Sequence, residues 1–250
     1  MLNQTPPKSD PNWQQEAFKD LFREGFEDRA VELVIKGYRR MCKEGLYNFL
    51  WDEERFSAVL VGCIDKSCQM FARLTHQVWD VQREHYKDNE QIQKGERNPR
   101  AVPRIDIVIF NWSRIGAKKR RFSFECKLLD DQDANLIRLY IREGLIDRYL
   151  NGEKDYSAGL PWGGMIGYIR RGNHDIIATK LNSQIDRQLN PLIGHLDLYK
   201  LIADFDAIYR SKHQHPNQTK ILTIMHLLLT FRSQISIKVE DVSQNIFSSE

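Results

Sequence analysis

Two strand-like stretches with alternating apolar and polar residues lie in the middle of the chain, at 103–110 and 122–129. Alternation places the apolar positions of the second stretch on one face, namely Phe122, Phe124, Cys126 and Leu128. Glu125 and Lys127 point the other way. In the first stretch the isoleucines share one face, namely Ile105, Ile107 and Ile109, and Asp106 lies opposite them. A basic, turn-prone segment at 111–121 joins the stretches, so the pattern predicts a β-hairpin.

Helical spacing of apolar residues marks the flanking segments. Helices are predicted at 13–45 (with a break at Gly25), 51–74, 129–151 and 175–189. Shorter apolar runs predict strands at 77–84, 165–169 and 221–229. The expected fold is therefore an α/β protein with a mixed sheet flanked by helices and with an N-terminal helical extension.

The composition limits the classes of function. A net charge of +3 is mildly basic and compatible with a nucleic-acid partner, although weaker than in a dedicated binding domain. No run approaches the roughly 20 apolar residues of a membrane span, and no secretory signal is recognisable. Four cysteines without metal-ligand spacing predict reduced thiols in a cytoplasmic protein.

The hairpin brings two acids and a lysine together, namely Asp106, Glu125 and Lys127. Burying such charges is costly unless something compensates them, and a divalent cation is the simplest candidate. Hard oxygen ligands suit Mg²⁺, or Mn²⁺, with Asp106 and Glu125 as ligands and the Cys126 backbone carbonyl as a third. Lys127 would orient or deprotonate an attacking water, or stabilise developing negative charge. An ion-paired strand face without catalytic consequence is the alternative.

A further acid lies at the start of the helix predicted at 51–74. Extending its apolar face back by one turn reaches Glu53 rather than Glu54. A carboxylate on the core-facing side of a helix indicates a nearby cation or catalytic centre. Alternatively, both glutamates belong to the first turn, where the helix dipole favours acids. A one-residue error in phase would exchange them.

The order Pro103-Arg-Ile-Asp106, then Glu125-Cys-Lys127 on an adjacent strand after an acidic helix, resembles the PD-(D/E)xK nuclease superfamily. Arg104 and Ile105 separate Pro103 from Asp106, so the literal Pro-Asp pair is absent. The resemblance implies a restriction-endonuclease-like fold and a Mg²⁺-dependent endonuclease that hydrolyses phosphodiester bonds, with DNA favoured over RNA. It divides the chain into a disordered leader (1–12), a helical extension (13–50) and a nuclease domain (51–250, core about 51–170).

The segment 140–168 and the late Ser-Lys-His loop before a His-Leu-Leu-Leu strand also resemble small bacterial proteins of this superfamily from anti-phage defence systems. That resemblance implies a defence role with a partner protein, and it leaves the oligomeric state open. The alternative is a non-catalytic subunit that uses a nuclease-like fold for nucleic-acid binding or assembly.

Basic residues give candidate phosphate contacts. They are Lys118, Lys119, Arg120 and Arg121 at the hairpin tip, Arg170 and Arg171 after the strand at 165–169, and Arg138, Arg142 and Arg148 on the helix after the hairpin. Tyr140 and Arg142 are further candidates for facing the site. His213 and His215 are expected in a loop, and His226 in the core. The glycines at 163–167 lack the spacing of a phosphate-binding loop, and close packing explains them better.

Overall fold

A computed structural model describes residues 11–75, 78–86, 104–112, 119–150, 156, 160–188, 193–214 and 221–231. The polar residues at 86–99 predict an exposed loop, of which Tyr86 lies in a strand and 87–99 lie outside the described ranges, as do the leader before residue 11 and His215. Within them, no helix is both long and apolar enough to cross a membrane.

The chain forms a mixed seven-stranded sheet of order β1-β2-β3-β4-β7-β6-β5. The strands are β1 (Val78–Tyr86), β2 (Arg104–Trp112), β3 (Lys119–Asp130), β4 (Trp162–Arg171), β5 (Asp197–Leu198), β6 (Ile208–Gln214) and β7 (Ile221–Thr230). The predicted hairpin is confirmed, since β2 pairs antiparallel with β3. On its other side β3 pairs parallel with β4. β3 therefore lies where the sheet changes from antiparallel to parallel.

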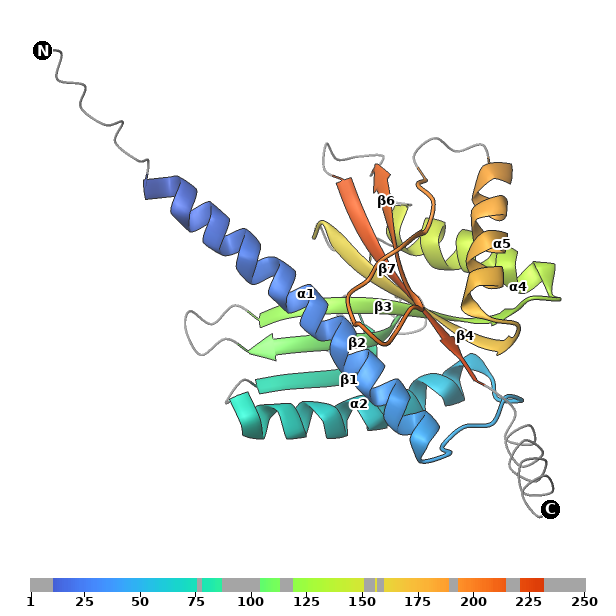
Figure 1. The fold of residues 1–250 in the computed structure, drawn as a ribbon, viewed down its shortest axis with the longest axis horizontal. Helices are drawn as coiled ribbons and strands as arrows, with labels where there is room; N and C mark the ends of the chain where they lie inside the picture. Colours follow the sequence, from blue (N-terminus) through green and yellow to red (C-terminus); the bar gives the residue numbers. More distant parts are fainter. Residues whose placement is uncertain are drawn as a thin grey trace, which may run out of the picture.

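Helices cover both faces of this sheet (Figure 1). α1 (Pro11–Lys43) and α2 (Glu53–Thr75) pack on one face in a core that includes Phe56, Phe124 and Tyr168. α4 (Ala134–Leu139), the π-helical segment η2 (Tyr140–Leu150) and α5 (His174–Arg187) pack with the other face in a second core. The result is a three-layer α/β protein with a mixed sheet, as the sequence predicted.

α1 corrects the expected helix break. The helix runs through Gly25 without interruption and begins at Pro11, inside the expected leader. A single glycine costs a helix only about 1 kcal/mol relative to alanine. Burial of the residues that follow, including Phe26, Ala30 and Val31, offsets that cost.

The segment expected as one helix at 129–151 also differs. β3 continues to Asp130, Asp133 caps α4, and from Tyr140 the helix widens into η2. π-helices are rare, and they occur frequently at functional sites. Tyr140 and Tyr149 are both buried on η2 although they are nine residues apart. Nine residues are about two and a half turns of an α-helix, which would turn the two rings to opposite sides.

β4 begins earlier than the strand expected at 165–169. Gly163 and Gly164 lie inside it. A methyl group added to Gly164 would overlap the ring of Phe124 and would lie 2.7 Å from Phe122 Cε1. The close-packing interpretation of these glycines is therefore confirmed.

Candidate functional site

The site begins where β2 and β3 separate. Their ladder ends at the pair Ile107–Phe124. One residue further along β2, a side chain replaces the backbone pairing. The Oδ2 of Asp106 accepts a hydrogen bond from the backbone N–H of Cys126 at 2.8 Å. Ile107 and Ile109 lie in the first core as expected, but Ile105, beyond the last β2–β3 pair, packs in the second core. Asp106 is thus held beside β3.

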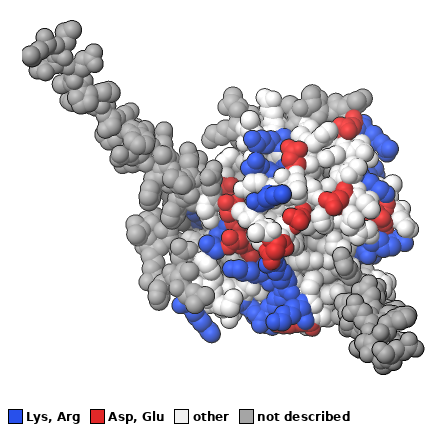
Figure 2. All heavy atoms as spheres, in the orientation of Figure 1, with Lys and Arg blue, Asp and Glu red and all other residues white. Residues whose placement is uncertain are grey.

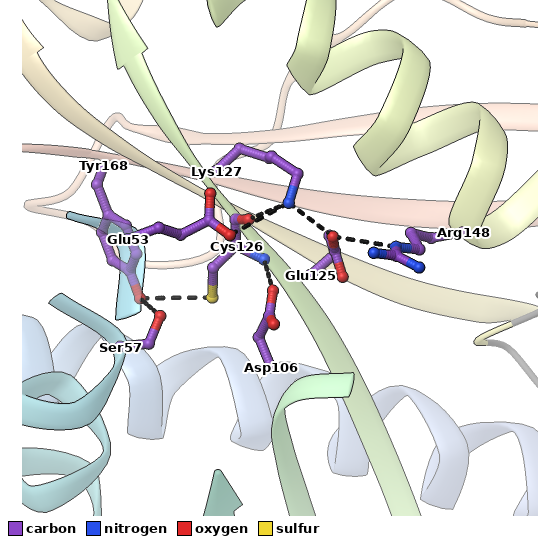
Figure 3. Close-up of polar contacts among 8 residues, drawn as sticks. All are labelled: Glu53, Ser57, Asp106, Glu125, Cys126, Lys127, Arg148 and Tyr168. Atoms are coloured by element: carbon purple, nitrogen blue, oxygen red, sulfur yellow. Dashed lines mark hydrogen bonds and ion pairs between the residues drawn. The ribbon is translucent and has the colours of Figure 1, made fainter. Parts of the chain in front are cut away.

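Glu125 and Lys127 share a face of β3, as alternation predicted. The Nζ of Lys127 donates to Glu125 Oε1 at 2.7 Å and to the Cys126 carbonyl at 2.9 Å. The Glu125 side chain is 1% exposed and that of Lys127 is 13% exposed. This is a buried charge cluster, and Figure 3 shows Lys127 at its centre.

Glu53 joins the cluster from the opposite side (Figure 3). Its Oε1 accepts from Lys127 Nζ at 3.2 Å. Asp52 precedes it and caps α2, since its carboxylate accepts from the backbone N–H of Arg55 at 2.9 Å. Glu54 is exposed. The helix phase predicted from the apolar residues therefore selects the correct glutamate to approach the β3 charges.

Arg148 is a second cation at the same carboxylate, and sequence reasoning placed it only on a general basic surface. Its Nε donates to Glu125 Oε1 at 3.2 Å, and its guanidinium lies 5.3 Å from the ring centre of Tyr156. η2 brings it there together with Gly144, whose added Cβ would lie 3.5 Å from Lys127 Cγ. One sequence feature could have predicted this contact. Arg148 is next to a buried position on the helix that follows the Glu-Cys-Lys strand.

Burial governs the electrostatics of the acids. Burial, foremost, and the adjacent charge of Asp106 together raise the pKa of Glu125 to about 8, against the opposing effects of Lys127 and Arg148. Burial likewise raises the pKa values of Asp106 and Glu53. Burial lowers the pKa of Lys127, but Glu125 and Glu53 outweigh it, so that pKa lies above its usual value. The lysine therefore remains charged among carboxylates that are costly to ionise.

One observation in particular indicates that these residues are suited to bind a divalent cation. Glu125 Oε2 is buried and has no hydrogen-bond partner. An orphaned carboxylate oxygen next to a second carboxylate favours a cation. Among the described residues, however, no three His, Cys, Asp or Glu side chains are arranged as a ready metal site. Asp106 and Glu125 are the carboxylates that would hold the ion, and the Cys126 carbonyl is the backbone oxygen beside them.

Of the basic residues predicted to contact nucleic acid, Arg148 enters this cluster, whereas Arg171 pairs elsewhere. Lys118 lies outside the described residues, as does the side chain of Lys119, while Arg120 and Arg121 are half-buried near the start of β3. Arg171 Nε donates to Oδ2 of Asp130, the last residue of β3, at 2.7 Å. Arg170 has a buried Nε without a partner. On the face drawn in Figure 2, basic and acidic side chains are interspersed.

Two further candidates for the site are not in it. Arg142 is exposed and pairs with Asp147 at 3.8 Å. Tyr140 is buried, and its hydroxyl lies 3.0 Å from Nδ1 of His226. Cys126 faces the first core, where its sulfur accepts from the Tyr168 hydroxyl at 3.4 Å. Burial raises the pKa of this thiol, so Cys126 does not fit the role of a nucleophile.

The histidines form a buried chain of hydrogen bonds. His226 is a core residue, as predicted, but His213 is not in a loop, because it lies buried in β6. Ser211 Oγ connects them, 2.6 Å from His213 Nε2 and 2.7 Å from His226 Nε2. The backbone N–H of Gly194 donates to His213 Nδ1 at 3.2 Å. Each polar group gains a partner, which is why this polar-looking stretch can be buried.

Comparison with protein-family models, with curated proteins and with solved structures finds no match for this chain. The arguments about function therefore come from the residues and geometry described above.

Proposed function

We propose that the chain is a divalent-metal-dependent nuclease with a restriction-endonuclease-like fold, and that Asp106, Glu125, Lys127 and Glu53 form its active site. The observation that carries the proposal is the convergence of these four residues from β2, β3 and α2, with a buried and unpartnered oxygen on Glu125. A bound cation would give that buried oxygen a partner.

Each residue has a distinct role in the proposed reaction. Asp106 and Glu125 hold the ion, with the Cys126 carbonyl as a third oxygen. Bound Mg²⁺ or Mn²⁺ would activate water and neutralise charge on the phosphate. Lys127 orients the attacking water or stabilises the negative charge that develops on the phosphate oxygens. Glu53 holds the Lys127 ammonium from the side of α2.

Arg148 extends this proposal. Its Nε is used by Glu125, and in the described part of the chain its remaining guanidinium nitrogens have no hydrogen-bond partner. A guanidinium fork matches a phosphate in geometry and in charge. With a side chain that is 27% exposed, Arg148 can meet substrate while it still contacts a proposed metal ligand.

We propose DNA as the substrate, on the resemblance of the Asp106 and Glu125-Cys-Lys127 pattern to DNA-cleaving proteins of the PD-(D/E)xK superfamily. We further propose a role in a cytoplasmic bacterial defence system with a partner protein, on the resemblance of the later segments.

Cleavage assays test the proposal directly. Purified protein is incubated with plasmid DNA, linear DNA, single-stranded DNA and RNA, each with Mg²⁺, Mn²⁺ or EDTA. Wild type is expected to cut DNA only with metal, and Glu125→Gln and Lys127→Met are expected to abolish cutting. Glu54→Gln is the matched control, because Glu54 neighbours Glu53 in the first turn of α2 but is exposed. Binding of nucleic acid without metal binding or cutting, alone or with a partner, would favour the non-catalytic alternative.

A further inference from the structure

The ammonium of Lys127 lies in a cage of oxygens from three different groups. It contacts Glu125 Oε1 at 2.7 Å, the Cys126 carbonyl at 2.9 Å and Glu53 Oε1 at 3.2 Å (Figure 3). Two carboxylates and a backbone carbonyl are the hard ligands that Mg²⁺ and Mn²⁺ also prefer. Two of these groups, Glu125 and the Cys126 carbonyl, are also proposed metal ligands, together with Asp106.

We propose that Lys127 occupies the cation position of the metal-free site, so that a divalent ion must displace its ammonium, and that a substrate phosphate assists by drawing Lys127 away. This inference rests on the proposed function, because it concerns the same metal site. It adds that the lysine regulates metal binding before it takes part in chemistry.

The geometry allows Lys127 to leave its present position. The side chain of Lys127 has a flexible four-carbon stem and is 13% exposed, so rotation about the stem can carry its ammonium to another partner. Glu125 would not be released at the same time. Arg148 holds the same Oε1 at 3.2 Å and would keep the carboxylate in place. The two cations on one oxygen thus have separable roles, one exchangeable and one retained.

Substrate would change the balance between lysine and metal. A phosphate anion offers Lys127 a new partner, and its departure exposes the oxygens of Glu125 and Cys126 to the ion. By linkage, a phosphate that raises metal affinity is itself bound more tightly when metal is present. The metal-free protein should therefore bind divalent ions weakly, and the complex with nucleic acid should bind them more tightly.

The test measures Mn²⁺ binding by isothermal titration calorimetry, without nucleic acid. Lys127→Met is expected to bind Mn²⁺ at least tenfold more tightly than wild type, and Glu125→Gln at least tenfold more weakly. Lys66→Met is the matched control, because it removes the same charge from an exposed position on α2, and it should stay within twofold of wild type. Circular dichroism verifies folding, and Lys127→Gln replaces Lys127→Met if the latter does not fold.

A second titration adds a short phosphorothioate DNA duplex and Ca²⁺. Wild type should gain Ca²⁺ affinity relative to the duplex-free protein, while Lys127→Met should gain little because its site is already open.

Unchanged or weaker Mn²⁺ affinity in Lys127→Met, together with loss of binding in Glu125→Gln, would overturn the displacement model but keep the metal site. Absence of Mn²⁺ binding in both wild type and Lys127→Met would overturn the inference and the metal-dependent function. Tighter binding in Lys127→Met with no cleavage by wild type would support the inference while removing the nuclease proposal.

Discussion

The carboxylate of Asp106 accepts a hydrogen bond from the backbone N–H of Cys126, 2.8 Å away, at the point where the pairing of β2 with β3 ends. Asp106 therefore has a structural role as a partner for β3 and, in the proposed function, a chemical role as a metal ligand. The two roles depend on different properties of the side chain. Accepting the hydrogen bond needs only an oxygen, which an amide also supplies, whereas binding a cation needs the negative charge of the carboxylate.

Asp106→Asn should separate these roles. Its Oδ1 can still accept from Cys126, and repulsion with Glu125 disappears, so the unfolding free energy should not fall. Cleavage should drop at least 100-fold because the charge is lost. Asp106→Ala should lose cleavage too, and about 1–3 kcal/mol of stability, because the buried N–H of Cys126 is left unsatisfied. Urea titration and cleavage rates measure both effects, and equal stabilities of the two variants would contradict the structural role.

Arg148→Met should lower kcat by about 100-fold if the guanidinium stabilises charge on the phosphate. Arg142→Met is the matched control on the same segment, because Arg142 is exposed and lies outside the cluster. It should change kcat by less than twofold. Arg148→Lys should recover part of the rate, since it restores the charge without the planar fork. Comparable rates in Arg148→Met and Arg142→Met would remove Arg148 from the proposed site.

Gly164→Ala should destabilise the protein by about 1–3 kcal/mol, because the new methyl group would overlap the buried rings of Phe124 and Phe122. Gly62→Ala is the control. Gly62 is exposed on α2 with no atom near its added Cβ, and alanine favours a helix by up to about 1 kcal/mol. The two substitutions should therefore shift the urea midpoint in opposite directions, and a shift in the same direction would contradict the packing of β4 against β3.

Stability should fall in mild acid because of the buried histidines. Burial lowers the pKa of His213 from its usual 6.5 to about 4, so between these values the unfolded chain binds the additional proton. The contribution of His213 is complete above pH 6.5, and roughly 3 kcal/mol is lost as pH falls toward 4. Burial lowers the pKa of His226 as well, which acts in the same sense. His213→Gln should flatten the decline in unfolding free energy over this range, and an unchanged slope would argue against a neutral His213.

Local patterns were enough to predict the centre of the candidate site. Alternation alone put Glu125 and Lys127 on one face, and helix phase alone selected Glu53 over Glu54, because both periods are set by the backbone. Features that depend on distant partners were not predictable in this way. His213 was predicted in a loop. It can be buried because Ser211 and Gly194 give its two ring nitrogens hydrogen-bond partners, and Ser211 in turn contacts His226. Arg148 reaches Glu125 because η2 is π-helical. The apolar spacing at 129–151 predicted an α-helix, which would orient Arg148 differently.

The two tyrosines of η2 hold this segment to the sheet at both ends. The Tyr140 hydroxyl lies 3.0 Å from Nδ1 of His226 on β7, and the Tyr149 hydroxyl donates to the carbonyl of Gly164 on β4 at 2.6 Å. Gly144 and Arg148 lie between them. Deleting one residue from this stretch would restore a tighter helix only by withdrawing one tyrosine from its partner. The number of residues in η2 is therefore constrained as well as their identity, because the two tyrosine contacts fix the length of chain between them.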